Sequence, residues 1–130
     1  MYEFHIELQG DFEVVLDHLR EALQAEGLGI VSQVDVQQIV TDKLGQEIGP
    51  YLILGACAPG LALRVIEADP NAGTLLPYNV VVREPEAGRI VVNFMDPQET
   101  FAMAGNEAVA EVGREAHQII ERVADRLAAI

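Results

Sequence analysis

Residues 2–9 alternate strictly between apolar and polar side chains. Apolar residues occupy the even positions from Tyr2 to Leu8, and polar residues occupy the odd positions from Glu3 to Gln9. A period of two is typical of a β-strand with one face in the core and the other in water. The pattern therefore favours a sheet that helices cover mainly on one side.

An amphipathic helix is predicted next. Apolar residues from Phe12 to Leu23 recur at spacings of three and four, Asp11 is a suitable N-cap, and Gly27 is a suitable C-cap. The segment from Leu28 to about Val36 then predicts a second strand. On one parity of that strand lie Leu28, Ile30, Ser32, Val34 and Val36.

The middle of the chain predicts a short helix, an interior strand and a further helix. Residues 37–44 are compatible with a helix that ends at Gly45. Residues 51–57 are apolar on both parities, which indicates a strand inside the sheet. Pro59 suits the first turn of the helix that follows, with Leu61, Ala62, Val65 and Ile66 on its buried face.

The last third predicts a hairpin and a long helix. Residues 74–84 and 89–94 flank a four-residue loop with glycine at its end. Residues 89–94 are largely apolar on both parities, so we expect a cover on both sides of this strand, one of them a second subunit. The final helix begins at Gly105 or Asn106, and its apolar seam runs from Val109 to Leu127.

The predicted order is β-α-β-(α)-β-α-β-β-α within a single domain spanning residues 1–130. This order favours a two-layer α+β fold, in which helices lie mainly on one face of a mixed sheet of about five strands. We expect the protein to be a homodimer.

Charge and composition exclude several classes of partner. The formal net charge is −13, with eight basic residues against 21 acidic ones and no basic cluster. Nucleic acids and anionic membrane surfaces are bound largely through lysine and arginine, so neither is expected as a partner. With no signal-like or membrane-spanning run and one cysteine, we expect a soluble, cytoplasmic protein. No metal site or cofactor is expected, because His5, His18 and His117 form no metal-binding motif.

The only cysteine, Cys57, is the candidate catalytic residue. It ends the predicted interior strand, two residues before Pro59, and a helix N-terminus stabilises a thiolate. The alternative is that Cys57 packs as a small hydrophobic residue, as free cysteines often do. The backbone N–H groups of the Pro59 helix could likewise receive a small anion or be hydrated by water. The predicted ligand-binding residues are Cys57, Ala58, Gly60, Tyr78 and Asn79.

The chain resembles the domain of unknown function 302 family over nearly its whole length. The resemblance depends on Lys43-Leu44-Gly45, on Leu54 to Pro59, on Leu61-Ala62, on Leu75 to Val82 and on Asp96-Pro97. It implies a small α+β domain that is often dimeric and has no assigned activity. Ala58 and Tyr78 depart from the family pattern, in which asparagine and a second cysteine are common at these positions. If that cysteine lies near Cys57 in the family, Tyr78 should lie near Cys57 here.

Three functions are compatible with the sequence. The first is a homodimeric module that binds a small anionic or apolar ligand, or a protein partner, near Cys57 and Tyr78. The second is a thiol-dependent enzyme that uses Cys57 in redox or sulfur chemistry. The third is an interaction protein without a pocket. We favour the first, because the sequence contains no set of nucleophile, base and orienting residue and no cofactor fingerprint.

Overall fold

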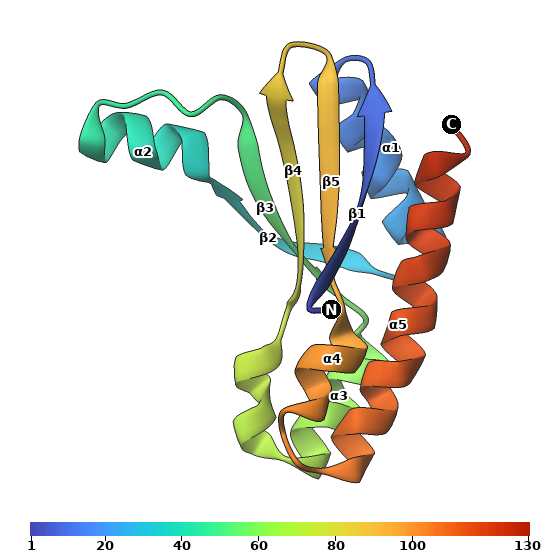
Figure 1. Ribbon diagram of the computed structural model, residues 1–130. Coiled ribbons are helices and arrows are strands. Elements are labelled where there is room, and N and C mark those ends of the chain that lie inside the picture. Colours follow the sequence, from blue (N-terminus) through green and yellow to red (C-terminus); the bar gives the residue numbers. More distant parts are fainter.

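The computed structural model describes residues 1–130, which form one five-stranded sheet and its helices (Figure 1). Every pair of neighbouring strands is antiparallel. In spatial order the strands are β1 (Glu3–Gln9), β5 (Arg89–Met95), β4 (Tyr78–Glu86), β3 (Tyr51–Cys57) and β2 (Gly29–Asp35).

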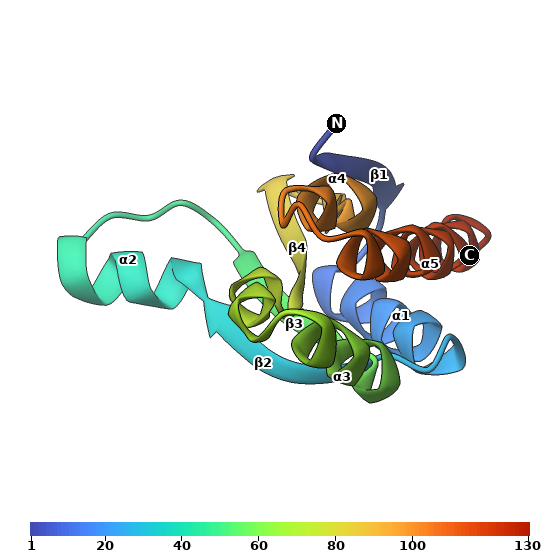
Figure 2. The same ribbon diagram turned by 90° about the horizontal axis from the view of Figure 1, so that it is seen from below.

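Two long helices cover one face of this sheet. They are α1 (Phe12–Ala25) and α5 (Glu107–Ala128), which lie side by side in both ribbon views (Figures 1 and 2). Beyond one end of the sheet lies a smaller helical lobe. It consists of α3 (Pro59–Ala68), the 3-10 helix η1 (Pro70–Leu75) and α4 (Pro97–Ala102).

The predicted two-layer α+β architecture is confirmed, but the sheet is entirely antiparallel rather than mixed. The reason is the path of the chain after β1: α1 carries it across the sheet, so that β1 and β2 become opposite edges. Strands that run in the same direction are therefore never neighbours. The core between sheet and helices includes Leu19, Leu23, Leu54, Val80, Val82, Ile120 and Val123, all at most 1% exposed.

The predicted helix ends are confirmed where the sequence has a capping residue. The carboxylate of Asp11 accepts a hydrogen bond from Val14 N at 3.2 Å, and the amide oxygen of Asn106 accepts from Ala108 N at 2.9 Å. Both bonds satisfy backbone donors that a helix leaves free at its start. The predicted seam of α5 is likewise buried from Val109 to Leu127, apart from Ile119, which is half-buried.

Strand β2 differs from its predicted pattern because it contains a β-bulge. Ile30 is opposite Ala56 and Ser32 is opposite Gly55, so the register shifts between them. The extra residue moves the side chains after it to the other face of the sheet. Leu28 and Ile30 therefore contribute to the core, whereas Ser32 and Val34 do not.

One prediction for the region between β3 and α5 needs correction, and one helix of this region was not predicted. Residues 74–77, expected at the start of a strand, belong to η1 and to the segment after it, and β4 begins only at Tyr78. Proline lacks the N–H that a central strand needs, which is consistent with Pro77 lying just before β4. The helix α4 was not predicted, although Asp96 caps it by accepting a hydrogen bond from Gln98 N.

The face of the sheet opposite α1 and α5 has no helix packed on it. The helix α2 (Val36–Leu44) does not cover that face, because it projects sideways from the body together with residues 45–50 (Figures 1 and 2). We call residues 36–50 the arm. The expectation that the β5 strand is covered on both sides is therefore met by helices on one side only. No helix combines the length and the apolar character that crossing a bilayer requires.

Candidate functional site

Cys57 occupies the predicted place between a strand and a helix. It is the last residue of β3, it is half-buried, and α3 begins two residues later at Pro59. The N-cap residue Ala58 provides no side-chain hydrogen bond to the first turn of α3. Ala58 is half-buried and Gly60 is exposed, so the start of this helix is accessible.

Tyr78 lies in the core on the helix-covered side of the sheet. It is 1% exposed, and its ring packs against Phe101 with a centroid distance of 5.6 Å. The hydroxyl group is buried without a hydrogen-bond partner. Burial is the main cause that raises the pKa of Tyr78, and Glu115 is a smaller one. In the sheet Tyr78 is opposite Ala56, the residue before Cys57.

The predicted residues do not all share one face. Asn79 is exposed opposite Gly55, on the side of the sheet without helices, and the alternation of β3 assigns Cys57 to that side as well. Tyr78 points the other way. Among the predicted ligand residues, only Asn79 contributes to one of the five larger cavities of the molecule.

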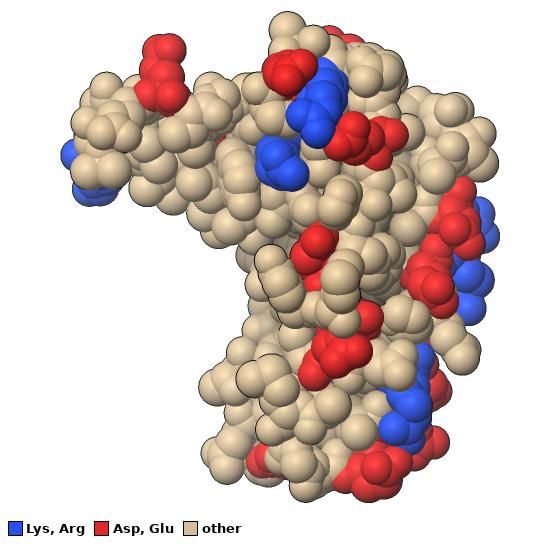
Figure 3. Space-filling model, in the orientation of Figure 1, with Lys and Arg blue, Asp and Glu red and all other residues tan.

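The largest of these cavities, of about 360 Å³, lies on the helix-free face of the sheet. We call this face the open face. Figure 3 shows the hollow shape of the molecule on this side, between the arm and the lobe of α3, η1 and α4. The cavity is lined by Tyr2, Glu3, Tyr51, Asn79, Val81, Arg83, Asn93, Phe94 and Met95.

A chain of hydrogen bonds crosses three strands at this cavity. Arg83 Nε on β4 donates to Asn93 Oδ1 on β5 at 3.1 Å, and Asn93 Nδ2 donates to Glu3 Oε2 on β1 at 3.1 Å. His5 Nδ1 lies 3.2 Å from the same carboxylate oxygen. The hydrogen bond from Asn93 is the main cause that lowers the pKa of Glu3. Desolvation opposes it, and His5 and the charge of Arg83 add smaller contributions that lower the pKa. The Glu3 carboxylate is therefore ionised at neutral pH.

Arg83 differs from the other arginines because no carboxylate pairs with it. The remaining six arginines all form ion pairs, so Arg83 and Lys43 are the two basic side chains without one. Arg83 is half-buried, and only its Nε is used in a hydrogen bond. In a chain with a net charge of −13, an arginine without an acidic partner is unexpected.

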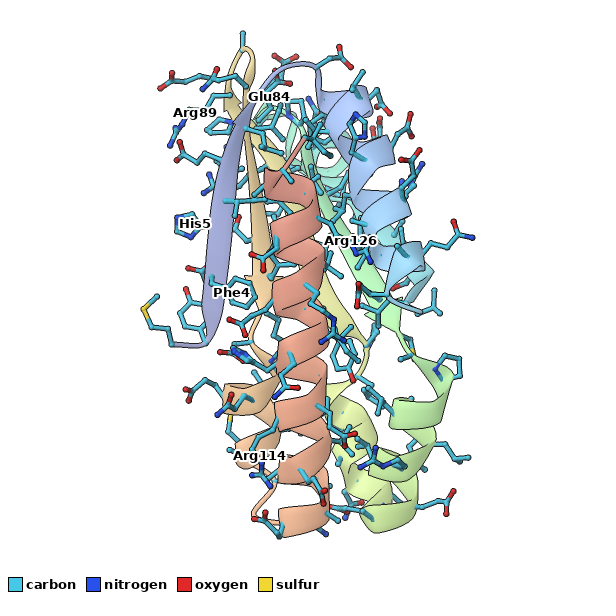
Figure 4. The ribbon with its side chains drawn as sticks, turned by 90° about the vertical axis from the view of Figure 1, so that its right-hand side faces the viewer. Phe4, His5, Glu84, Arg89, Arg114 and Arg126 are labelled. Atoms are coloured by element: carbon cyan, nitrogen blue, oxygen red, sulfur yellow. The ribbon has the colours of Figure 1, made fainter.

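The sequence did not predict this cavity, although it did predict that the odd-numbered residues of β1 face solvent. Figure 4 shows His5 and Arg89 projecting on the side of β1 away from α5. Arg89 pairs with Glu7 at 2.6 Å, whereas Arg83 does not reach a carboxylate. The available signal was one basic residue directly after the apolar run Val80-Val81-Val82. Whether this residue, Arg83, meets a polar partner depends on how β4 pairs with β5, and the sequence does not show this register.

Several polar residues outside this cavity have structural partners. Asp69 caps η1 by accepting from Asn71 N, and Glu84 accepts from Gly88 N within the hairpin loop. His117 Nδ1 lies 2.8 Å from Asp96 Oδ1. No three His, Cys, Asp or Glu side chains gather where they could hold a metal ion.

Comparison with known proteins identifies the family. The pattern of the family described as "Domain of unknown function DUF302" matches residues 4–128. The fold is similar to the crystal structure of an uncharacterized conserved DUF302 protein from Bacillus stearothermophilus, with a TM-score of 0.89 and 24% identity over 98% of each chain. The comparison with curated proteins gives no match. The expected resemblance is confirmed, and the chain belongs to the DUF302 family.

Proposed function

We propose that this protein is a homodimeric binding module that holds a small ligand on the open face of its sheet. The observation that carries the proposal is the cavity of about 360 Å³ on the only face of the sheet that no helix covers. Ligand sites are concave and combine apolar walls with a few oriented polar groups. This cavity has both, since Val81 and Met95 line it together with Arg83 and Asn93.

The homodimer is supported by the arm. None of the side chains of α2 is buried, and nine residues are too few for a helix that is stable without packing partners. Four large apolar residues of the arm and of β2 next to it are between 41% and 68% exposed: Val34, Ile39, Leu44 and Ile48. Apolar surface that gathers on a projecting segment is typical of an interface, and a two-fold dimer would use the arm of each copy in the same way.

The test of the homodimer is the mass of the protein in solution. We expect sedimentation equilibrium to give twice 14.1 kDa at micromolar concentration, and Leu44→Glu to give the monomer mass. Leu63→Glu on α3 is the matched control, because Leu63 is 56% exposed and lies outside the arm. A wild-type protein that stays monomeric at 100 µM would contradict the homodimer.

A second candidate function is thiol chemistry at Cys57. It is supported by the half-buried position of Cys57 beside a helix start without a side-chain cap. If Cys57 is a reactive thiol, iodoacetamide should modify the folded protein faster than the protein unfolded in urea. If Cys57 reacts only after unfolding, it is a packing residue and the thiol function is wrong.

A further inference from the structure

We propose that Arg83 binds the carboxylate of a small organic acid in the open-face cavity, and that the apolar body of this acid lies on the sheet beside it. The inference rests on the proposed function, since it names the class of ligand for the same cavity. The site differs from the one predicted around Cys57 and Tyr78, with which it shares only Asn79.

The guanidinium of Arg83 is fixed in place and still available. Its Nε donates to Asn93, which in turn donates to Glu3, so one edge of the group is held through β5 and β1. The two terminal nitrogens have no hydrogen bond to the protein and no ion pair. Asn93 stands between Arg83 and Glu3 and forms a hydrogen bond with each of them. Because Arg83 does not contact Glu3 directly, its terminal nitrogens can pair with the acid of a ligand. A planar guanidinium can donate two parallel hydrogen bonds to a carboxylate.

The charges around the cavity favour an anion with a single negative charge. Arg83 is the one basic residue that lines the cavity, and Glu3 lines it as well in its ionised form. A dianion such as phosphate would be repelled by Glu3 and by the net charge of −13 with no second cation to compensate. A carboxylate brings one negative charge instead of two, and it can pair directly with Arg83, which no carboxylate of the protein does.

The walls of the cavity favour an acid with an apolar body. Tyr51, Val81 and Met95 line it from three adjacent strands, and all three are half-buried. The volume of about 360 Å³ lies at the lower end of the range for small-molecule sites. Asn79 adds an exposed amide at the rim, which can bond to a polar substituent of the ligand.

The experiment titrates the full chain with two small probes of the same shape. Benzoate carries the carboxylate, and benzamide replaces it with a neutral amide. We expect benzoate to shift the backbone amide resonances of Val81, Arg83 and Asn93 in two-dimensional NMR spectra. Benzamide should bind at least about tenfold more weakly, because the charge-assisted hydrogen bonds to Arg83 are lost.

Variants and a second anion test the role of Arg83. Arg83→Gln should weaken benzoate binding at least about tenfold. Arg89→Gln is the matched control, since Arg89 lies on the same face but pairs with Glu7 and does not line the cavity. Inorganic phosphate should not displace benzoate. The comparison of benzoate with benzamide uses the wild-type protein, so the proposal stays testable even if Arg83→Gln does not fold.

The outcomes separate this inference from the proposed function. If both probes shift the cavity resonances with equal affinity, or if phosphate displaces benzoate, the cavity binds ligands but the carboxylate assignment is wrong. If neither probe shifts these resonances, ligand binding on the open face is wrong as well. A monomeric protein that binds benzoate through Arg83 would contradict the homodimer and leave this inference intact.

Discussion

The two faces of the sheet are built from the same strands and are used in different ways. On the covered face, Leu54, Val80 and Val82 are at most 1% exposed and meet α1 and α5 in one apolar cluster. On the open face, Arg83 of β4, Asn93 of β5 and Glu3 of β1 form a chain of hydrogen bonds. Alternation along a strand thus separates two tasks at adjacent residues.

The difference between the two faces shows that stability has not been maximised on the open face. The open face includes an arginine without an acidic partner and a cavity, and the arm beside it exposes apolar side chains. None of these features contributes much to folding. Their concentration on one side of the molecule is the reason for assigning binding to that side and stability to the other.

The largest effect is expected from truncating the covered face. Leu54→Ala removes a fully buried side chain from β3, which should lower the free energy of unfolding by about 2–5 kcal/mol. Ile53→Ala changes the next residue, which is half-buried on the open face, and should cost about 1 kcal/mol. Urea denaturation of both variants provides the measurement. Equal losses would contradict the division of tasks between the two faces.

A second comparison concerns two glycines in helices. A Cβ atom at Gly113 of α5 would lie 2.7 Å from the carbonyl oxygen of Pro97, a backbone atom that cannot easily move. Gly113→Ala should therefore lower the free energy of unfolding by about 1–3 kcal/mol, despite the better helix propensity of alanine. Gly60→Ala meets no atom within 4 Å and should stabilise the protein by about 0.4–1 kcal/mol. A neutral Gly113→Ala would show that α4 and α5 pack less closely than described.

A smaller effect of opposite sign is expected at Tyr78. Its hydroxyl is buried without a hydrogen-bond partner, and a polar group in that state opposes folding. Tyr78→Phe keeps the ring on Phe101 and should raise the free energy of unfolding by about 1 kcal/mol. Thermal and urea denaturation measure this change. A loss of stability would mean that the hydroxyl has a partner, which would favour the site predicted around Cys57 and Tyr78.

Local patterns predicted the fold well because each is determined by nearby residues. Each of these patterns can be recognised in a short stretch of sequence. Examples are the alternation of β1, the apolar seam of α5 and the capping residues Asp11 and Asn106. The bulge in β2 and the helix α4 were missed for the same reason. The bulge between Ile30 and Ser32 is defined only by the pairing of β2 with β3, which no local pattern contains. The helix α4 has six residues, which are too few to show a helical period in the sequence.

The candidate site was less predictable because it depends on contacts between distant strands. Arg83, Asn93 and Glu3 meet only once β4, β5 and β1 are in register. The sequence shows that Asn93 lies within an apolar strand. It does not show that Asn93 Oδ1 accepts a hydrogen bond from Arg83 Nε at 3.1 Å. Cys57 stood out because it is unique in the chain, and its position at the start of α3 agrees with the prediction. Its role stays a prediction.

The smallest effect concerns the charges at the edge of the open face. The hydrogen bonds from Arg89 lower the pKa of Glu7 below 4.5, its ordinary value. A lowered pKa stabilises the folded state above pH 4.5, and this contribution is lost as the pH falls through the lower pKa of the folded state. The effect should be small, since the side chains of Arg89 and Glu7 are 36% and 47% exposed and salt screens their charges.

Glu7→Gln tests this contribution by urea denaturation at pH 7 and pH 3. The variant should be less stable than the wild type at pH 7, and the difference should shrink at pH 3. Glu47→Gln is the control, because Glu47 is exposed on the arm and pairs with no basic residue. If Glu7→Gln leaves stability unchanged at pH 7, the ion pair with Arg89 contributes nothing measurable. Arg89, which is paired, and Arg83, which is not, would then differ in ligand binding and not in their contribution to stability.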